Sequence, residues 1–460
     1  MAVPTFRAAE LAAATGGVWR QGVVPRELLS GIVTDTRRAC AGALFLALAG
    51  ERFDAHNFLR NAIAGGCAAL CIEASKADRL PPECSVPVLE VADTLAAYRD
   101  IAHFHRLRFP SLRLAAVTGS VGKTSVKEML RAIFEAAAGP DAVLYTEGNT
   151  NNQIGVPQNL LRLEERHRYA VIEAGTNHPG EIEPLSRCAA PQIALINSIA
   201  PCHLEFLGSL AGVAREKAHL FDGLPENGCA VIPGNCPEVG ILEDAARNYA
   251  TVLRFGETID CDVRARYFGG RLTGSRFELT FPDGKQFEVE WALSGRHQAV
   301  NASAAACAAL AAGIAPEVIV RGLANTRLPG MRTKVTEIEG VTYVNDAYNA
   351  NPGSMRASLA WLAEFAKPAR LILALGEMRE LGENSPKEHA ALLKLARETF
   401  PEARILSVGS AFAPTPEVEH FSDAAAAASR LAEMARPGDL VFAKGSRGIA
   451  MELALPEAAR

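Results

Sequence analysis

The stretch from Leu112 to Leu130 constrains the fold of this chain more than any other. An apolar run at 114–117 predicts a strand, TGSVGKTS at 118–125 predicts a glycine-rich turn, and helically spaced apolar residues follow. Such a turn lets backbone N–H groups converge on phosphate oxygens at the positive end of a helix. We therefore expect Lys123 to reach the β and γ phosphates of a nucleotide and the Thr124 hydroxyl to bind Mg²⁺.

Two points qualify this interpretation. The common G-x-x-x-x-G-K-[ST] pattern has its first glycine at position 117, where this chain has Val117. The alternative is a structural glycine turn followed by an exposed lysine. Because a strand, a turn, Gly-Lys-Thr and a helix coincide, the sequence favours the phosphate-binding loop.

The composition limits the classes of protein that this chain can belong to. With 47 Lys and Arg against 52 Asp and Glu, its net charge is −5, so no basic excess indicates nucleic acid or an anionic membrane. Residues 103–108, the most basic stretch, are interpreted as a helix end beside a linker.

The ten cysteines show no C-x-x-C spacing, which predicts reduced thiols in the cytoplasm. The N-terminus lacks the features of a signal peptide and no run of about 18 apolar residues occurs, so no membrane insertion is expected.

A length of 460 residues predicts about three domains. Residues 1–110 mix short strands and helices, which predicts a mixed α/β domain. Strand and helix alternate through 111–326, which predicts a parallel-sheet P-loop domain, with a small β excursion at 261–293. Pro329-Gly330 marks the second boundary, and residues 327–460 read as a Rossmann-like, doubly wound domain. The overall prediction is an α/β protein of three domains.

Polar loops follow several of the predicted strands. Glu173 ends the strand at 169–172, where a carboxylate beside the phosphate loop suits Mg²⁺, although a solvated strand-end glutamate is the alternative. His203 and Lys217, taken alone, predict only solvated side chains. In the last domain three loops, at 346–354, 376–379 and 444–447, follow strands, where doubly wound sheets bind ligands.

The first domain contains two polar stretches, 34–37 and 50–57, whose hydroxyls, arginine and loop backbone suit a nucleotide or sugar phosphate. Ordinary turn chemistry and helix capping explain them about as well.

Together these stretches resemble the Mur ligase family over nearly the whole chain. TGSVGKTS resembles the family's ATP loop, which also lacks the first glycine, so Val117 fits. DAYNANPGSM at 346–355 resembles the corresponding loop of the family members that add D-alanyl-D-alanine. Other matching stretches, in the expected order, are TEGNTNNQIGVP, EAGTNHPGEI, CHLEFLGS, GRHQAVNA, LGEMRELGE and KGSR.

The resemblance implies an ATP-dependent amide ligase of peptidoglycan synthesis, which serves cell-wall formation, cell shape and cell division. It would join D-alanyl-D-alanine to UDP-N-acetylmuramoyl-tripeptide through an acyl phosphate and release ADP and phosphate, acting as a cytoplasmic monomer. The outer domains would close around linkers near 110 and 328 to exclude water. Alternatives that share the phosphate loop are a folylpolyglutamate synthase-like ligase, a small-molecule kinase and a nonenzymatic NTP switch.

The resemblance also implies roles for individual residues. Two Mg²⁺ would be held by Thr124, Glu173, His203 and a carbamate on Lys217. Gln298 stands where the family has an asparagine. The catalytic set would be Lys123, Glu173, His203, Lys217 and Asp346. ATP would contact Thr118, Gly119, Ser120, Val121, Gly122, Lys123, Thr124, Ser125, His297, Asn301 and Arg332. The UDP-sugar peptide and the dipeptide would contact Thr34, Asp35, Thr36, Arg37, Asp54, His56, Asn57, Asn151, Asn152, Asn349, Asn351, Lys444, Ser446 and Arg447.

Overall fold

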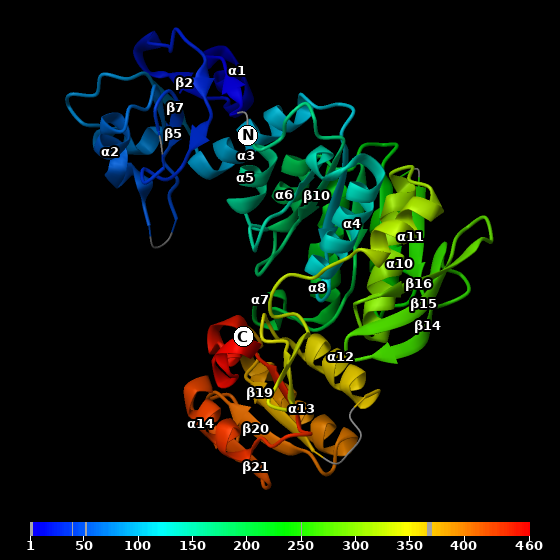
Figure 1. Cartoon of the computed structure of the whole chain (residues 1–460). Coiled ribbons are helices and arrows are strands. Elements are labelled where there is room, and N and C mark those ends of the chain that lie inside the picture. Colours follow the sequence, from blue (N-terminus) through cyan, green and yellow to red (C-terminus); the bar gives the residue numbers. More distant parts are fainter. Residues whose placement is uncertain (1–2, 39, 51–52, 250, 366–369) are drawn as a thin grey trace.

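The computed structural model describes residues 3–38, 40–50, 53–249, 251–365 and 370–460. Three α/β parts follow one another along the chain, with the central one between the other two (Figure 1). The predicted α/β architecture of three domains is confirmed. Among the described residues, no helix is both long and apolar enough to cross a membrane.

The N-terminal part is built on a five-stranded sheet whose order is β2-β7-β6-β5-β4. All its neighbouring strands run parallel except the pair of β2 and β7. A separate antiparallel pair joins β1 to β3. The elements are β1 (Thr5–Phe6), α1 (Ala8–Thr15), β2 (Val18–Trp19), β3 (Leu29–Ser30), β4 (Ile32–Val33), β5 (Leu44–Leu46), α2 (Leu59–Ala64), β6 (Ala69–Glu73), β7 (Val88–Val91) and α3 (Thr94–Leu107).

Helix α3 joins the N-terminal part firmly to the central part. Tyr98 and Ile101 on this helix are buried in an apolar cluster that contains residues of both parts. Arg106 is also buried, and its guanidinium donates to the carbonyl of Phe109 at 2.8 Å and to the side chain of Gln192 at 3.1 Å. The basic stretch at 103–108 therefore forms the end of a packed helix, as predicted.

The central part has a nine-stranded sheet in the order β16-β15-β14-β13-β12-β11-β8-β10-β9. Its strands from β8 to β14 run parallel, whereas β14, β15 and β16 pair antiparallel. The predicted β excursion thus extends the main sheet, because Phe255 of β13 pairs in parallel register with Val263 of β14. The strands are β8 (Arg113–Thr118), β9 (Val143–Tyr145), β10 (Tyr169–Glu173), β11 (Ile193–Ile196), β12 (Cys229–Pro233), β13 (Thr251–Gly256), β14 (Val263–Arg271), β15 (Gly274–Thr280) and β16 (Gln286–Trp291).

The helix after the phosphate loop is held between the sheet and two further helices. Its apolar residues Val126, Met129 and Ile133 are fully buried, as the spacing predicts. The alanine-rich stretch 302–309 packs in the same cluster. The helices of this part are α4 (Lys123–Ala138), α5 (Gly155–Leu160), α6 (Ile182–Ala189), α7 (Leu204–Leu207), α8 (Leu210–Ala218), α9 (Val239–Ala246), α10 (Arg296–Ala311) and α11 (Pro316–Ala324).

The C-terminal part has a six-stranded sheet in the order β17-β18-β22-β19-β20-β21, parallel except for the edge strand β17. It contacts the central part through polar side chains and through Leu272 of the central part, which packs against its apolar cluster. Trp361 Nε1 donates to Ser294 Oγ at 2.9 Å, and the Tyr267 hydroxyl donates to Glu364 Oε2 at 2.7 Å. Its elements are β17 (Lys334–Ile338), β18 (Val341–Asn345), α12 (Pro352–Ala363), β19 (Leu371–Gly376), α13 (Ser385–Thr399), β20 (Arg404–Val408), β21 (Val418–Phe421), α14 (Ala424–Met434) and β22 (Leu440–Lys444).

Gly322 lets α11 pack closely on α4, and Gly322→Ala should destabilise the folded protein by disturbing this packing. A Cβ there would lie 2.4 Å from the Cα of Ile133 on α4. Overpacking of this kind costs about 1–3 kcal/mol. We expect the thermal unfolding midpoint, followed by circular dichroism, to fall by several degrees, at about 2–4 °C per kcal/mol. Gly240→Ala on α9 is the matched control, since no described atom lies within 4 Å of that Cβ. Equal shifts in the two variants would contradict this account.

Candidate active site

A cavity of about 690 Å³ lies where the three parts of the chain meet. The central part contributes the phosphate loop and the loops after β10 and β11. The N-terminal part contributes Leu48, Ala49, Gly50, Phe53 and Leu95. The C-terminal part contributes the loop after β18 and Lys444. The predicted site residues that line this cavity are Ser120, Val121, Gly122, Lys123, Thr124, Ser125, Asn151, Asn152, Glu173, His203, His297, Asn301, Arg332, Asp346, Asn349, Asn351 and Lys444.

The sheet brings the phosphate loop beside Glu173. Strand β8 lies between β10 and β11, and Val117 pairs with Glu173 in parallel register. Gly122, at the start of α4, has a φ of 82°, and a Cβ there would lie 2.5 Å from Asn197 Nδ2. That amide donates to the carbonyl of Val121 at 2.9 Å. Glycine is therefore required at position 122 by both its backbone angle and the lack of space.

Thr124 and Glu173 form a buried oxygen pair at the start of α4. The Thr124 hydroxyl donates to Glu173 Oε2 at 3.0 Å, and Asn151 Nδ2 donates to Glu173 Oε1 at 2.9 Å. Glu173 is only 2% exposed. Hydroxyl and carboxylate oxygens are ligands that Mg²⁺ prefers, so this donor set fits the predicted ion.

Arg332 reaches this pair from the segment that links the central and C-terminal parts. Its Nη2 donates to Thr124 Oγ1 at 2.9 Å, and its guanidinium stacks on the Tyr348 ring at 3.8 Å from the centroid. The Tyr348 hydroxyl donates to Asn149 Oδ1 at 2.9 Å. Arg332 thus lies beside the loop at 118–125.

His203 and Lys217 lie on the other side of the phosphate loop. His203 precedes α7, and its Nδ1 is hydrogen-bonded to Glu380 of the C-terminal part. This hydrogen bond lowers the pKa of the Glu380 carboxyl. Lys217, on α8, is 1% exposed, and burial lowers the pKa of its amine to about 8. Lys217 is not among the residues that line the cavity.

Asp346 and Lys444 form an ion pair in the C-terminal wall of the cavity. Lys444 Nζ lies 2.7 Å from Asp346 Oδ2 and donates to the carbonyl of Asn349 at 3.0 Å. The Ser358 hydroxyl also donates to Asp346 Oδ2, at 2.9 Å. The pair therefore fixes the backbone of the loop at 346–351.

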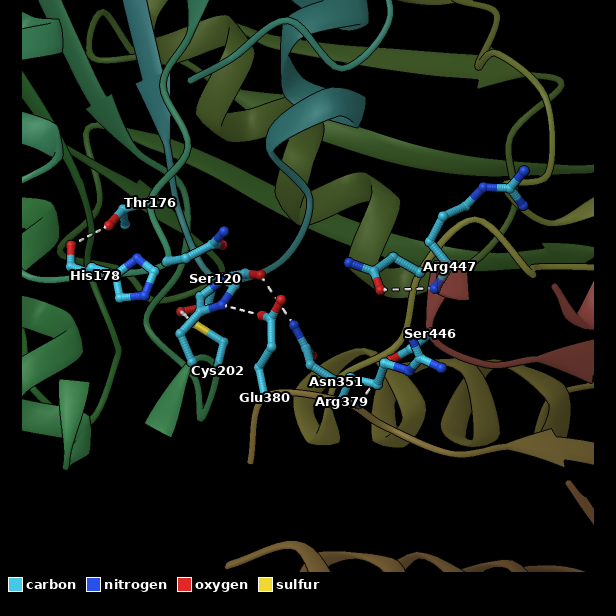
Figure 2. Close-up of polar contacts among 12 residues, drawn as sticks. Ser120, Thr176, His178, Cys202, Asn351, Arg379, Glu380, Ser446 and Arg447 are labelled. Atoms are coloured by element: carbon cyan, nitrogen blue, oxygen red, sulfur yellow. Dashed lines mark hydrogen bonds and ion pairs between the residues drawn. The ribbon is translucent and has the colours of Figure 1, made fainter. Parts of the chain in front are cut away.

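The same loop touches the phosphate loop directly. Asn351 caps α12 and its Nδ2 donates to the carbonyl of Ser120 at 3.2 Å, a contact drawn in Figure 2. Behind it, Ser446 Oγ donates to the carbonyl of Ala350 at 3.2 Å. Ser446 and Arg447 support the loop without lining the cavity.

His297 and Asn301 lie on α10 and line the cavity, with Asn301 beside Gly122 of the phosphate loop. Burial lowers the pKa of the His297 imidazole to about 4, so this ring is neutral at physiological pH. Asn301 Oδ1 accepts from Asn197 Nδ2 at 3.0 Å, and its Nδ2 donates to Gln298 Oε1 at 3.2 Å. Gln298, which departs from the family pattern, thus completes a row of amides beneath the loop.

Of the described residues in the polar stretches of the N-terminal part, only Gly50 and Phe53 line the cavity, and none of the predicted site residues at 34–37 and 54–57 does. Arg37 pairs with Asp35 at 2.6 Å, and its hydrogen bonds lower the pKa of the Asp35 carboxyl to about 2. His56 is buried: its Nδ1 lies 2.6 Å from Asp54 Oδ1, and its Nε2 accepts from the Glu73 N–H at 3.0 Å. Both ring nitrogens of His56 are therefore already engaged within the protein. In the same loop, Glu51 and Arg52 lie outside the described residues.

Several residues at the cavity were not assigned a role from the sequence. Phe53 lines it and stacks on Phe58 at 5.4 Å between ring centroids. Tyr348 and His178 also line it. Both of the latter lie inside stretches that carry the family resemblance, which is the signal that could have identified them. Phe53 carries no such signal beyond its place in a polar loop.

The fold and this site define a three-domain nucleotide-binding protein of the P-loop class. Residues 117–309 match the family model described as the Mur ligase middle domain, and residues 331–447 match that of the Mur ligase, glutamate ligase domain. The chain is 40% identical over 432 residues, 92% of each chain, to a protein of Escherichia coli (strain K12) named UDP-N-acetylmuramoyl-tripeptide--D-alanyl-D-alanine ligase. It is 33% identical over 440 residues, again 92% of each chain, to the protein of that name from Bacillus subtilis (strain 168). The chain belongs to the Mur ligase family.

Solved structures agree with this assignment. The crystal structure of MurF from Acinetobacter baumannii superposes with a TM-score of 0.90 at 33% identity, covering 99% of this chain and 98% of that one. MurF ligase from Thermotoga maritima in complex with ADP superposes with a TM-score of 0.80 at 26% identity, covering 92% and 95%. Folylpolyglutamate synthase from the same organism, at 17% identity, shares the fold alone.

Thr124→Val should weaken nucleotide binding only when Mg²⁺ is present. The substitution keeps the side-chain shape but removes the hydroxyl between Glu173 and Arg332. A hydrogen bond to a charged group contributes about 1.5–3 kcal/mol, so we expect at least a tenfold loss of ADP affinity with Mg²⁺. Calorimetry with Mg²⁺ and with EDTA measures the two affinities. Thr124→Ser, which keeps the hydroxyl, is the control; an equal loss of affinity in EDTA would argue against a role at the metal.

Proposed function

We propose that this chain is an ATP-dependent amide ligase that joins D-alanyl-D-alanine to the tripeptide carboxylate of UDP-N-acetylmuramoyl-tripeptide. The observation that carries this proposal is the cavity in which the phosphate loop meets loops of both flanking parts. Relatives that align over 92% of the chain are named for this reaction. The enzyme acts as a cytoplasmic monomer in peptidoglycan precursor synthesis and needs no nucleic acid.

The chemistry requires activation of a carboxylate. A carboxylate repels an attacking amine, and its oxide is a poor leaving group. The tripeptide carboxylate attacks the γ-phosphorus of ATP, ADP leaves, and an acyl phosphate forms. The amine of the dipeptide then attacks the acyl carbon, phosphate leaves with the bonding electrons, and the amine loses a proton. Phosphoryl transfer of this kind depends mainly on positioning and charge stabilisation.

The central part supplies these two factors. The backbone of the phosphate loop and Lys123 would bind the phosphates; the ammonium of Lys123 donates to the Gly119 carbonyl at 2.7 Å, which holds it at this loop. Thr124 and Glu173 would hold one Mg²⁺, which neutralises charge on the phosphates. His297, Asn301 and Arg332 complete the nucleotide site.

A second Mg²⁺ would be held by His203 and a carbamate on Lys217. A protonated lysine repels a cation, whereas a carbamate presents anionic oxygens. The unprotonated amine attacks CO₂ and releases one proton to give the carbamate. The burial of Lys217 supports this step, because it lowers the pKa of the amine to about 8 and so raises the fraction without a proton.

The flanking parts hold the two peptide substrates. The loop fixed by Asp346 and Lys444 presents Asn349 and Asn351 to the dipeptide, with Ser446 and Arg447 behind it. The N-terminal part holds the UDP-sugar through the 34–37 and 50–57 stretches, and Asn151 and Asn152 contact the peptide. Closure of the parts around the cavity excludes water, which would hydrolyse the acyl phosphate.

Phosphate release should depend on all four reactants. We expect turnover with ATP, Mg²⁺, UDP-N-acetylmuramoyl-tripeptide and D-alanyl-D-alanine, and loss of steady turnover when any one is omitted. A coupled phosphate assay measures the rate, and mass spectrometry identifies the pentapeptide product. Full phosphate release without the dipeptide would reject the ligase proposal, and a phosphorylated final product would indicate a kinase.

Lys217→Ala should lose nearly all activity and regain part of it with added formate or acetate, which supply an oxygen anion in the space left. In the wild-type protein supplied with ¹³C-bicarbonate, a carbamate signal in the ¹³C NMR spectrum should grow as pH rises through about 8, since the deprotonated amine reacts. The same spectrum of Lys217→Ala is the control. Unimpaired activity of Lys217→Ala would disprove the carbamate role.

A further inference from the structure

A hydrogen bond between His203 and Glu380 links the central and C-terminal parts at the cavity. His203 lines the cavity, and its Nδ1 contacts Glu380 Oε2. Figure 2 shows Glu380 and Asn351, both from the C-terminal part, directed toward Ser120 and Cys202 of the central part. The pair is therefore made only while these two parts are docked.

The loop that carries Glu380 is fixed within its own domain. The N–H of Met378 donates to His389 Nε2 at 2.9 Å, and the N–H of Arg379 donates to Ser446 Oγ at 2.9 Å. Next to Glu380, Gly382 packs against α7, where a Cβ would lie 3.2 Å from Glu205. The packing of this loop on α7 thus holds the Glu380 carboxylate beside His203 Nδ1.

Both members of the pair adopt an uncommon backbone conformation. His203 has a φ of 51° and Glu380 a φ of 62°, in the left-handed region that residues other than glycine seldom occupy. Such conformations persist where the surrounding structure enforces them, and they gather at functional sites. His203 and Glu380 both adopt this conformation and contact each other across a domain boundary. The surrounding structure therefore holds both residues in the positions that this contact requires.

The chemistry of the pair determines the state of the imidazole. A carboxylate can only accept, so the proton of the ring lies on Nδ1. A ring that donates from Nδ1 and binds a metal does so through Nε2, and among the described residues Nε2 makes no hydrogen bond. Metal-binding histidines commonly donate their other ring N–H to a carboxylate, which fixes the tautomer and orientation and raises the basicity of the ligand.

We propose that Glu380 is a positioning residue, which sets His203 as an Nε2 ligand for the second metal only when the C-terminal part is docked. This inference rests on the proposed function for the identity of that metal. It adds a carboxylate from a second domain to the site, so that the metal site and the closed arrangement form together. A purely structural contact between the two parts would hold them together without changing the intrinsic metal affinity of His203.

The test measures metal binding without turnover. Mn²⁺ is titrated into the full-length protein with a non-hydrolysable ATP analogue, and free Mn²⁺ is followed by electron paramagnetic resonance. His203→Ala first identifies the His203-dependent site. We expect Glu380→Ala to weaken Mn²⁺ at this site about 10–100-fold, the usual effect of losing such a partner. Glu380→Gln, whose amide oxygen still accepts from Nδ1, should weaken it less.

The double variant separates a positioning role from a merely structural one. If Glu380 acts through His203, then Glu380→Ala causes no further loss in the His203→Ala background. Glu383→Gln is the matched control, since it removes a carboxylate three residues away for which the described residues record no hydrogen bond or ion pair.

Three results would overturn the inference: wild-type Mn²⁺ affinity in Glu380→Ala, an equal loss in both backgrounds, or no effect of His203→Ala. Because the titration uses neither peptide substrate, its outcome is independent of the phosphate-release assay that tests the proposed function.

Discussion

The parallel register of β8 with β10 is the constraint on which the rest of the site depends. It places Val117 beside Glu173, so that the carboxylate emerges at the same edge of the sheet as the phosphate loop. The Thr124 hydroxyl then reaches Glu173 at 3.0 Å, and Asn151 and Arg332 bind to the same two side chains. Because the carboxyl ends of parallel strands meet at one edge of the sheet, the sheet topology alone brings together loops that are far apart in the sequence.

This constraint explains which parts of the site could be predicted from the sequence. The phosphate loop, the strand that ends at Glu173 and the helix that begins at Lys123 are local patterns, and each is found where the residues indicate. His203 and Lys217 are different, because nothing in their neighbouring residues marks them. Only the family resemblance singled them out, and the burial of Lys217 within the fold is a tertiary effect that no short pattern carries.

The remaining features depend on partners distant in the sequence. The contact of Arg332 with Thr124 and the pair of His203 with Glu380 each join the central part to the C-terminal part. His56 shows a limit of predicting ligand-binding residues from the sequence alone. It belongs to a polar loop that suits a ligand, yet its two ring nitrogens bind Asp54 and the backbone of Glu73. Composition shows that a loop carries polar groups, but only the fold shows which of them satisfy the protein itself.

The two domain boundaries differ in the cost of opening them. Between the N-terminal and central parts, α3 contributes Tyr98 and Ile101 to a shared apolar cluster, and exposing such side chains costs about 1.5–3 kcal/mol each. At the cavity, the C-terminal part is held by polar contacts such as that of Asn351 with Ser120. Water can replace a hydrogen bond of this kind at a net cost of about 0.5–1.5 kcal/mol. At the cavity itself, the boundary with the C-terminal part therefore rests on contacts that water can replace, in contrast to the apolar cluster around α3.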